Sequence, residues 1–533
     1  MGTPFAAEPA STSGVIAQRK PDRERWLAAL AGLLAAATTL GVAQLAAALV
    51  SPESAPLVAV GGAFIDATPP WLKDFAVATF GTRDKAVLLL AMSVFIAGLA
   101  ALAGVLARRR WGLGAVLVMA LAAVGGVAAA TRPSAGPLAS LPSIVGGGAG
   151  LFALRTLLDR LPRPGDPVRP TRMRRPGELD RRSFLTAAAI TTAIAAMAAA
   201  GGQLVGRATR TVQAARDALR LPAPAIPAAA LPAGFESGVV GAVPFVTPND
   251  DFYRIDTALV VPQVDAETWS LRVHGLVEEE VVLTFQDLLD AELIESWVTL
   301  TCVSNEVGGN LAGNAKWLGY PLRELLARAR PTAGADMVLS TSADGFTAST
   351  PLAALTDDRD AILAVGMNDE PLPIVHGFPV RMVVPGLYGY VSATKWVVDL
   401  EVTRFADARA YWSDRGWSEK GPIKTASRIE VPRPGSPLTA GRVAVGGTAW
   451  AQHRGITAVE VQVDDGDWVP ATLATEASVD TWRQWSYPWD ATAGRHRLTV
   501  RATDTTGEVQ TSELAEPAPD GATGWHSVSV TVT

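Results

Sequence analysis

The chain has 533 residues, 49% of them hydrophobic, and its formal net charge at pH 7 is −6. A chain of this length can hold several domains, and so apolar a composition indicates membrane segments rather than a wholly soluble protein. Acidic residues outnumber basic ones after residue 231, which excludes this half as a nucleic-acid binder because a phosphate backbone attracts positive charge.

Four apolar runs near the N-terminus predict transmembrane helices, because each approaches the ~20 residues that cross about 30 Å of hydrocarbon. The runs cover approximately Trp26–Val50, Ala86–Ala107, Trp111–Ala130 and Leu138–Leu158. The fourth is interrupted by Pro142 and by glycines at 146–148, so a re-entrant or buried segment is its alternative. Gly146 and Gly150 have the small-xxx-small spacing that lets two helices pack closely.

Clusters of basic residues indicate how these helices are oriented. One cluster lies in residues 1–25, Arg108–Arg110 lie between the second and third runs, and nine arginines fall between Arg155 and Arg182. If the helices alternate in direction, all three clusters lie on one side, which the positive-inside rule makes the cytoplasm. Residues 1–25 are then a cytoplasmic tail.

A fifth apolar stretch, Phe184–Val205, follows directly after the pair Arg181–Arg182. The junction resembles a twin-arginine export motif placed inside the chain, and an ordinary helix with a positive flank is the alternative. Both interpretations place everything after Val205 outside the cytoplasm. We therefore expect a multi-pass protein of the bacterial cell membrane, with about five helices over residues 26–205 and its remaining domains on the extracytoplasmic side.

The composition changes after residue 205. Residues 206–235 contain a Pro/Ala-rich tract that predicts a semi-rigid spacer. Residues 236–420 mix short β-rich runs with helical pieces, which predicts an α+β domain. Residues 421–533 hold alternating strands separated by turn signals, which predicts an immunoglobulin-like β-sandwich. The expected fold class is therefore multi-domain, with transmembrane α-helices, an α+β domain and a β-sandwich.

Cysteine and histidine usage narrows the possible metal sites. Cys302 is the only cysteine, which excludes internal disulfides and cysteine-rich zinc or iron–sulfur sites within one chain. All five histidines lie at or beyond His274, so the hydrophobic half cannot supply the paired histidines of a membrane haem.

Cys302 stands where an alternating strand, ending at Thr301, meets a loop rich in glycine and asparagine. A loop at a strand end commonly presents a side chain to a cofactor. Thiolate is a soft ligand and suits a transition metal. A buried cysteine that acts as a small hydrophobe is the alternative that this segment alone leaves open.

Three polar side chains, His376, Arg381 and Lys395, are threaded through an apolar, turn-rich segment downstream. Arginine recognises phosphate with a fork of donors, and lysine supplies a point charge. Taken singly, His376 is typical of a hydrogen-bonded core histidine and Arg381 of a surface charge. As a set, the three indicate a site for a phosphate-bearing cofactor.

The motifs around these residues resemble those of the sulfite oxidase family of molybdopterin-dependent oxidoreductases, in its membrane-anchored bacterial type. The runs that resemble the family's molybdopterin-binding signature are His376-Gly-Phe-Pro-Val-Arg381, Pro385-Gly386 and Lys395-Trp396. Thr247-Pro-Asn249 with Phe252-Tyr-Arg254 is similar to its early cofactor-binding segment, and Cys302 with Asn305 to its metal-ligand motif. The tryptophan and arginine pattern after residue 440 is similar to its C-terminal dimerisation domain.

The resemblance implies a molybdenum–molybdopterin cofactor, with the Cys302 thiolate as the protein's ligand to the metal. It implies that other side chains also hold the cofactor, namely Asn249, Arg254, Asn305, His376, Arg381 and Lys395. Arg254 would lie beside the metal and substrate, as a catalytic residue together with Cys302. Such centres transfer an oxygen atom and a pair of electrons, so the implied function is oxygen-atom transfer on a small substrate at the outer face of the membrane.

Departures from the family pattern bear on the substrate. Sulfite-oxidising relatives have two arginines where this chain has Glu306 and Val307, and an Asn-His pair where it has Ile255 and Asp256. Fewer cations and added carboxylates weaken the binding of a doubly charged oxyanion. A neutral electron acceptor such as a sulfoxide is therefore expected, and sulfite is the alternative.

The resemblance also implies partners. No stretch resembles a cytochrome b5 haem domain, so a separate electron-transfer partner, a cytochrome or a quinone-linked protein, is expected. The C-terminal domain implies a homodimer. The alternative from another class is a membrane-tethered, non-catalytic binding protein that kept the fold and lost the metal, and the presence of Cys302 argues against it.

Overall fold

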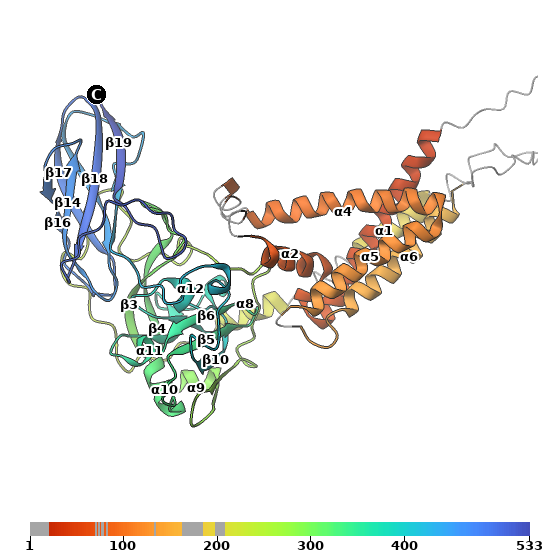
Figure 1. The fold of residues 1–533 in the computed structure, drawn as a ribbon, viewed down its shortest axis with the longest axis horizontal. Coiled ribbons are helices and arrows are strands. Elements are labelled where there is room, and N and C mark those ends of the chain that lie inside the picture. Colours follow the sequence, from red (N-terminus) through yellow and green to blue (C-terminus); the bar gives the residue numbers. More distant parts are fainter. Residues whose placement is uncertain are drawn as a thin grey trace, which may run out of the picture. The chain divides into compact units, whose positions relative to one another are not determined.

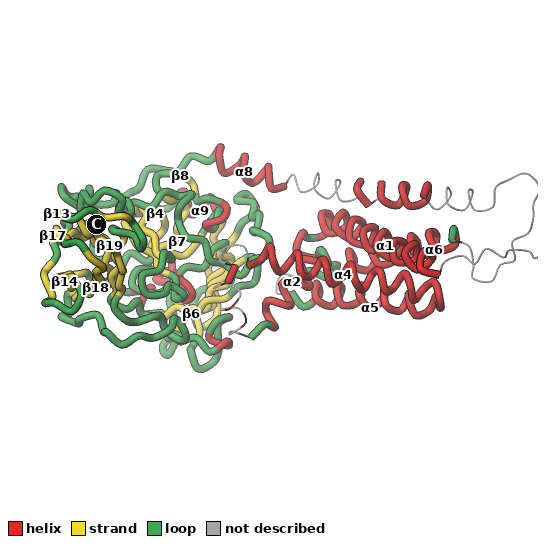
Figure 2. Tube along the Cα trace, turned by 90° about the horizontal axis from the view of Figure 1, so that it is seen from above, coloured by secondary structure: helices red, strands yellow, loops and turns green. Residues whose placement is uncertain are grey.

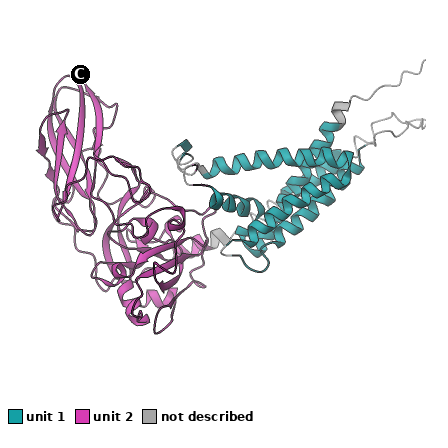
Figure 3. Cartoon of the chain, in the orientation of Figure 1, with its two compact units in different colours: residues 1–68, 73–206 teal, residues 69–72, 207–533 magenta. Residues whose placement is uncertain are grey.

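The structure is a computed structural model that describes residues 21–69, 72, 75, 79–80, 84–132, 135–161, 185–193, 195–197 and 208–533. The chain forms two compact units, coloured separately in Figure 3. Unit 1 comprises residues 1–68 and 73–206, and unit 2 comprises residues 69–72 and 207–533. All the candidate site residues belong to unit 2.

Unit 1 is built from apolar helices. Its longer described elements are α1 (Pro21–Val50), α2 (Pro56–Ala67), α4 (Asp84–Arg109), α5 (Trp111–Ala130) and α6 (Leu141–Asp159), with a 3-10 turn, η1 (Pro52–Ser54), before α2 (Figure 1). The helices α1, α4, α5 and α6 each contain a segment long and apolar enough to cross a membrane, by length and composition alone. They correspond to the four runs predicted from the sequence.

Helix α6 continues unbroken through the glycines that interrupt its apolar pattern. Pro142 lies in its first turn, where no backbone N–H is needed. A side chain at Gly146 would lie 2.6 Å from the Thr39 carbonyl oxygen of α1, and one at Gly150 would collide with the Thr39 hydroxyl. The two glycines therefore let α6 and α1 lie side by side (Figure 2), which confirms the close packing expected from their spacing.

Some of the predicted topology lies outside the described residues. This holds for the Arg181–Arg182 pair of the export motif and for residues 1–20 of the tail. Of the fifth apolar stretch, residues 185–193 and 195–197 are described, and they are helical. Helix α2 was not predicted, because its 12 residues are fewer than a membrane crossing needs.

The second part of the segment predicted as a spacer, its Pro/Ala tract, packs along unit 2. After α8 (Ala208–Ala218), the Pro/Ala tract runs beside the start of β3 (Ile294–Thr301). The Ala225 N–H donates to the Leu293 carbonyl (2.8 Å), and the Glu295 N–H donates to the Ile226 carbonyl (2.8 Å). Because proline has no N–H, only the residues between the prolines donate, so the tract lies at a sheet edge instead of standing free.

The first part of unit 2 combines two sheets with short helices. One sheet has the order β2 (Val281–Thr284), β1 (Ser270–Gly275), β10 (Val397–Thr403), β5 (Met337–Ser342) and β6 (Thr347–Pro351). The other has the order β3, β4 (Ala312–Pro321), β7 (Ile362–Met367) and β8 (Glu370–Pro371), with β9 (Arg381–Val383) paired to β7. The short helices are α9 (Phe285–Leu289), α10 (Leu322–Ala329), α11 (Ala353–Thr356) and α12 (Gly389–Ser392), with 3-10 turns η3 (Ile374–His376) and η4 (Ser413–Arg415).

The second part of unit 2 is two facing sheets. One has the order β11 (Ala426–Val431), β13 (Gly441–Trp450), β17 (Arg483–Ala491) and β16 (Thr472–Leu473). The other has the order β12 (Pro437–Leu438), β19 (His526–Val532), β18 (Gly494–Asp504), β14 (Ile456–Val463) and β15 (Trp468–Pro470). Alternate residues of both sheets, Trp485 and Val500 among them, form one buried core between them.

Candidate active site

One pocket in unit 2 brings together four of the side chains singled out in the sequence. It encloses about 920 Å³ of space not filled by atoms, including the solvent at its open mouth. Cys302, His376, Arg381 and Lys395 line it, although they are far apart in the sequence. Its wall also contains aromatic and acidic side chains, including Tyr253, Asp256, Asp344, Phe346, Tyr390, Trp412 and Trp417.

The strand β3 carries Cys302 to the pocket. Most of its residues are buried, and it ends at Thr301 in the middle of unit 2. The Cys302 N–H donates to the Leu311 carbonyl (2.9 Å), and the Asn305 N–H donates to the Cys302 carbonyl (3.1 Å). The Asn305 side-chain oxygen accepts the Leu311 N–H at 2.7 Å. Asn305 therefore closes the loop that holds Cys302, and its side chain does not line the pocket.

The surroundings of Cys302 favour a neutral thiol when no metal is bound. The residue is 8% exposed, and burial raises the pKa of its thiol, while hydrogen bonds from Ser304 oppose the rise. Tyr253 lies close enough for the two groups to influence each other's charge, and burial raises its pKa as well. A thiolate at this position therefore needs a positive partner, such as a metal ion.

His376 is a neutral imidazole with a defined tautomer. Its Nε2 lies 3.0 Å from the Asn249 carbonyl oxygen, which can only accept, so Nε2 carries the hydrogen. Burial and then the nearby charge of Arg381 lower the pKa of His376 to about 4. Asn249 positions the ring through its main chain. Its side chain is instead engaged with the turn after β7, where its oxygen accepts from the Asn368 amide at 2.9 Å.

Arg381 is 5% exposed and is held in place by carbonyl oxygens. Its Nη1 donates to His376 (3.1 Å) and its Nη2 to Ala393 (3.3 Å), and the guanidinium carbon lies 5.1 Å from the centre of the Trp317 ring. Burial lowers the pKa of Arg381 to about 10. The guanidinium therefore stays charged at neutral pH with carbonyl oxygens, and no carboxylate of the described residues, as its hydrogen-bond partners. This is a costly state that a bound anion relieves.

Lys395 shares a carboxylate with Arg254. Its Nζ lies 2.7 Å from Asp256, whose side chain is 4% exposed, and it also donates to the Val375 carbonyl at 3.2 Å. Arg254 Nε lies 3.0 Å from the same Asp256 oxygen, but its side chain is 41% exposed and does not line the pocket. Burial lowers the pKa of Lys395 to about 8, against the opposing effect of Asp256.

The C-terminal sandwich supports the strand that carries Cys302. Gln452 Nε2 donates to the Thr299 carbonyl (3.1 Å) and to the Thr301 hydroxyl (2.9 Å), both on β3. Arg428 Nη1 donates to the Gly309 carbonyl (2.7 Å) in the cysteine loop. A side chain at Gly308 would collide with the ring of His526. Two residues of the sandwich thus hold the backbone on either side of Cys302 by hydrogen bonds, and a third, His526, lies close to it at Gly308.

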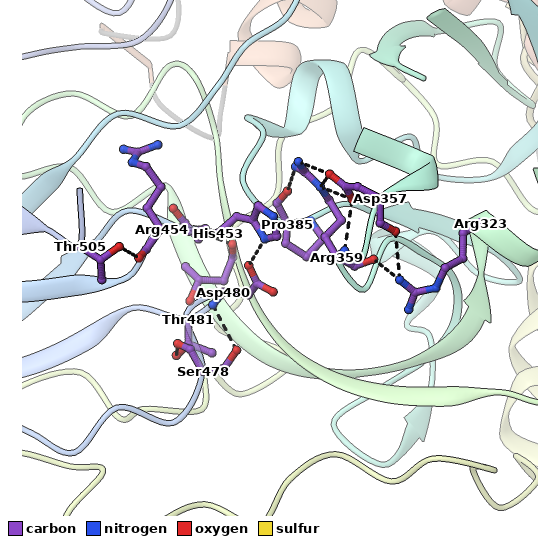
Figure 4. A network of polar contacts seen from close by, with 12 residues as sticks. Arg323, Asp357, Arg359, Pro385, His453, Arg454, Ser478, Asp480, Thr481 and Thr505 are labelled. Carbon is purple, nitrogen blue, oxygen red and sulfur yellow. Dashed lines mark hydrogen bonds and ion pairs between the residues drawn. The ribbon is translucent and has the colours of Figure 1, made fainter. Parts of the chain in front are cut away.

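A second network of polar contacts includes the turn at Pro385 and residues of the sandwich (Figure 4). Arg359 Nη1 donates to the Pro385 carbonyl (2.8 Å), while Nη2 pairs with Asp357 at 2.7 Å. His453 of the sandwich lies 3.3 Å from Asp480, and the Asp480 carbonyl accepts the Thr299 N–H at 3.0 Å. The cysteine strand is therefore tied to the sandwich, and the turn at Pro385 is tied to the Asp357–Arg359 pair.

Comparisons with known proteins assign this arrangement to a family. The sequence profile described as "Oxidoreductase molybdopterin binding domain" matches residues 258–412. Mitochondrial sulfite oxidase of Homo sapiens is 30% identical over 322 residues, covering 51% of this chain and 58% of that protein. An uncharacterised oxidoreductase, YuiH, of Bacillus subtilis is 31% identical over 183 residues, covering 33% of this chain and 87% of that protein. The chain belongs to the sulfite oxidase family.

Family membership makes the chain a molybdopterin-binding oxidoreductase with a molybdenum cofactor, as the sequence predicted. The chain spans little more than half the length of the human relative. Among solved structures, the sulfane dehydrogenase SoxCD of Paracoccus pantotrophus matches 54% of this chain and 82% of its own, with 25% identity and a TM-score of 0.48.

The residues of the pocket fit such a cofactor. Within the described residues, no three His, Cys, Asp or Glu side chains gather into a metal site, so a metal at Cys302 needs ligands that a cofactor supplies. Arg381 and Lys395 offer positive charge to a phosphate. In the described part of the chain the Ser342 hydroxyl, in the pocket wall, is buried without a hydrogen-bond partner, as expected of a group that meets a ligand.

The structure adds residues that the sequence did not single out. Tyr253, Ser342 and Phe346 line the pocket, and only Tyr253 stood inside a recognised motif. Glu306 and Val307, which were expected to weaken the binding of an oxyanion, line a second, smaller pocket together with Asn305 and do not line the main pocket. The carboxylates that the main pocket does contain are Asp256 and Asp344.

Proposed function

We propose that this protein is a membrane-anchored molybdenum-cofactor oxidoreductase that transfers an oxygen atom to or from a small substrate on the outer face of the membrane. The observation that carries the proposal is the pocket in which Cys302, His376, Arg381 and Lys395 meet. A soft thiol at one wall and buried cationic groups at another suit a metal and a phosphate held by one cofactor.

Each residue has a proposed role. Cys302 binds the metal as a thiolate, and His376, Arg381 and Lys395 hold the pterin and its phosphate. When bound, the cofactor supplies the two-electron oxygen-atom transfer. Asn305 keeps the cysteine loop closed and Asn249 fixes the tautomer of His376, so both act by positioning, whereas Arg254 acts on the site through the shared Asp256.

The proposal extends to the whole chain. Residues 26–205 anchor the protein by about five helices, residues 236–420 form the molybdopterin domain, and residues 421–533 form an immunoglobulin-like sandwich that makes a homodimer. The basic clusters support a cytoplasmic side for the loop at Arg108–Arg110. Export by the twin-arginine route moves folded proteins, which suits a cofactor inserted before crossing.

The proposed substrate is a neutral electron acceptor such as a sulfoxide. Reduction of a sulfoxide consumes two electrons and two protons and yields a sulfide and water, with the electrons coming from a separate cytochrome or quinone-linked partner. Asp256 and Asp344 in the pocket disfavour a doubly charged oxyanion. Sulfite is the second candidate, because the relative from Homo sapiens is a sulfite oxidase.

An activity screen of the full-length protein in detergent tests this proposal. A reduced dye donor with sulfoxides is compared with an oxidised dye acceptor with sulfite, after molybdenum analysis of the same sample. We expect stoichiometric molybdenum and sulfoxide reduction. Protein that contains no molybdenum after expression in a cofactor-competent host would instead support a non-catalytic binding protein.

A further inference from the structure

The pocket's cations are already engaged by oxygen atoms of the chain. Arg381 donates to the carbonyls of His376 and Ala393, and Lys395 lies 2.7 Å from Asp256. Asp344 adds a second carboxylate to the wall. Among the described lining residues the two carboxylates therefore balance the two cations, so a doubly charged substrate meets no net positive charge from them.

Four aromatic side chains form another part of the pocket wall, and we call them the aromatic wall: Phe346, Tyr390, Trp412 and Trp417. They come from the hairpin after β5, from α12 and from the segment around η4. Trp417 packs on both Trp412 and Tyr390, with ring centres 5.9 Å apart in each pair. This arrangement could not be predicted from the sequence, since the three segments are separate in the chain.

Other contacts hold the aromatic wall in place. The Tyr390 hydroxyl donates to the Ser418 carbonyl at 2.6 Å, and Tyr411 joins Phe346 to Trp412 with ring centres 5.7 and 5.2 Å away. Tyr390 and Trp417 are each 8% exposed. Rings fixed in this way need little further ordering when a ligand packs on them, which favours binding.

We propose that the aromatic wall binds an apolar, preferably aromatic, group of the substrate, and that the pocket selects uncharged organic substrates over oxyanions. This inference rests on the proposed function, since it names the substrate class of the same site. Ring faces carry partial negative charge, so they attract apolar or cationic groups and repel anions. Asp344 beside Phe346 strengthens that preference.

Three related ligands test the proposal with the full-length holoprotein and a reduced dye donor. Methyl phenyl sulfoxide has the ring, dimethyl sulfoxide lacks it, and 4-(methylsulfinyl)benzoate has the ring with an added carboxylate. We expect the KM of methyl phenyl sulfoxide to be lower than that of either other ligand by roughly tenfold. Equal KM values for the two uncharged sulfoxides, or a lower KM for the benzoate, would overturn the proposal.

Substitutions in the aromatic wall test whether it causes the lower KM of methyl phenyl sulfoxide. Trp412→Leu is expected to raise the KM of methyl phenyl sulfoxide by roughly tenfold and to change kcat less, and Phe346→Leu is a milder second variant if the first folds poorly. The matched control is Trp468→Leu, because Trp468 packs edge-to-face against Trp525 in the sandwich and does not line the pocket. Asp344→Asn should lower the KM of the benzoate relative to that of the uncharged ligand.

Binding measured by calorimetry separates the role of the aromatic wall from the proposed reaction. If methyl phenyl sulfoxide binds, and Trp412→Leu weakens its binding, but no sulfoxide is reduced, the aromatic wall is correct and the proposed reaction is wrong. If sulfoxides are reduced with KM values that neither Trp412→Leu nor Phe346→Leu changes, the reaction is correct and the aromatic wall is wrong. Sulfite oxidation with the lowest KM of all contradicts both.

Discussion

Burial controls the charge state of individual residues in the pocket. It lowers the pKa of His376 to about 4, of Lys395 to about 8 and of Arg381 to about 10. Each shift means that the folded chain holds the protonated form less favourably than water does. A bound phosphate would reverse that effect, most of all at Arg381, whose hydrogen-bond partners among the described residues are carbonyl oxygens, whereas Lys395 already pairs with Asp256.

Lys395→Met tests the anion site. Loss of the buried ammonium should lower cofactor occupancy of the purified protein severalfold, because a charge-assisted contact to a phosphate is worth about 1.5–3 kcal/mol. Molybdenum and pterin content, measured per protein, check this expectation. Lys424→Met is the matched control, since Lys424 pairs with Asp520 outside the pocket (2.8 Å). Equal loss of cofactor in both variants contradicts a specific role for Lys395.

At the scale of elements, the sandwich acts as a support for the cysteine strand. Gln452, Arg428 and His526 all contact the backbone within a few residues of Cys302. In the proposed reaction a misplaced Cys302 thiolate would lose the geometry that oxygen-atom transfer requires, so we expect the sandwich to affect catalysis without touching the substrate.

Gln452→Leu should disturb the cysteine strand without unfolding the protein. The change removes two hydrogen bonds to β3 and leaves the Thr299 carbonyl without that partner, at a cost of about 1–3 kcal/mol. We expect kcat to fall about tenfold or more with little change in KM, together with an altered molybdenum spectrum.

Gln462→Leu is the matched control for that variant. Gln462 makes a solvent-exposed hydrogen bond to Gly466 on the same sandwich, at 2.8 Å. An unchanged molybdenum spectrum in Gln452→Leu, at full cofactor content, would show that the support is not needed.

His526 makes the junction sensitive to acid. Its Nδ1 accepts the Ile429 N–H at 2.9 Å, so the contact requires the neutral ring, and burial followed by the charge of Arg428 lowers its pKa to about 4. In the unfolded chain His526 titrates near its ordinary pKa of ~6.5. Stability from the neutral ring is therefore complete above pH ~6.5 and is lost as the pH falls towards 4.

We expect His526→Gln to flatten this part of the pH dependence, since the amide oxygen can accept the same N–H without titrating. Urea midpoints of the detergent-solubilised protein between pH 7 and 4.5 measure the effect. Wild-type protein should lose up to about 1–3 kcal/mol more than the variant over this range. Parallel curves for the two proteins contradict the assignment.

The elements that the sequence predicted well are those with a local signal. The four apolar helices follow from composition, and the strand before Cys302 follows from its alternation. The set of His376, Arg381 and Lys395 was predicted to share a site, and the structure places all three on one pocket. Their contacts with a cofactor stay predictions.

The rest depended on contacts between distant segments. The Asn305 side chain accepts the Leu311 N–H and so faces its own loop and not a cofactor. The spacing of residues along the sequence does not reveal this hydrogen bond. The Pro/Ala tract has the composition of a spacer, yet its pairing with Ile294 comes from a strand almost 70 residues later. The aromatic wall likewise joins three segments that carry no common motif.

At the largest scale, the chain divides into two compact units. The apolar helices lie in unit 1, and the pocket lies in unit 2. The single cysteine is 8% exposed, so the native chain offers little background for thiol labelling. This makes the proposed orientation in the membrane directly testable.

Two single cysteines report on the orientation. Val240→Cys lies in unit 2 at a position that is 93% exposed, and Arg110→Cys lies between α4 and α5. A membrane-impermeant maleimide applied to intact spheroplasts should label the first and not the second, because Arg110 belongs to a proposed cytoplasmic cluster. Labelling of both after lysis is the control, and the reverse pattern in intact spheroplasts contradicts the topology.

Molybdenum X-ray absorption of Cys302→Ser beside the wild type tests whether Cys302 is the metal's protein ligand. We expect the wild type to show molybdenum with a thiolate sulfur that the variant lacks, at comparable pterin content, and we expect the variant to be inactive. An identical sulfur coordination and full activity in Cys302→Ser would show that the metal is bound elsewhere.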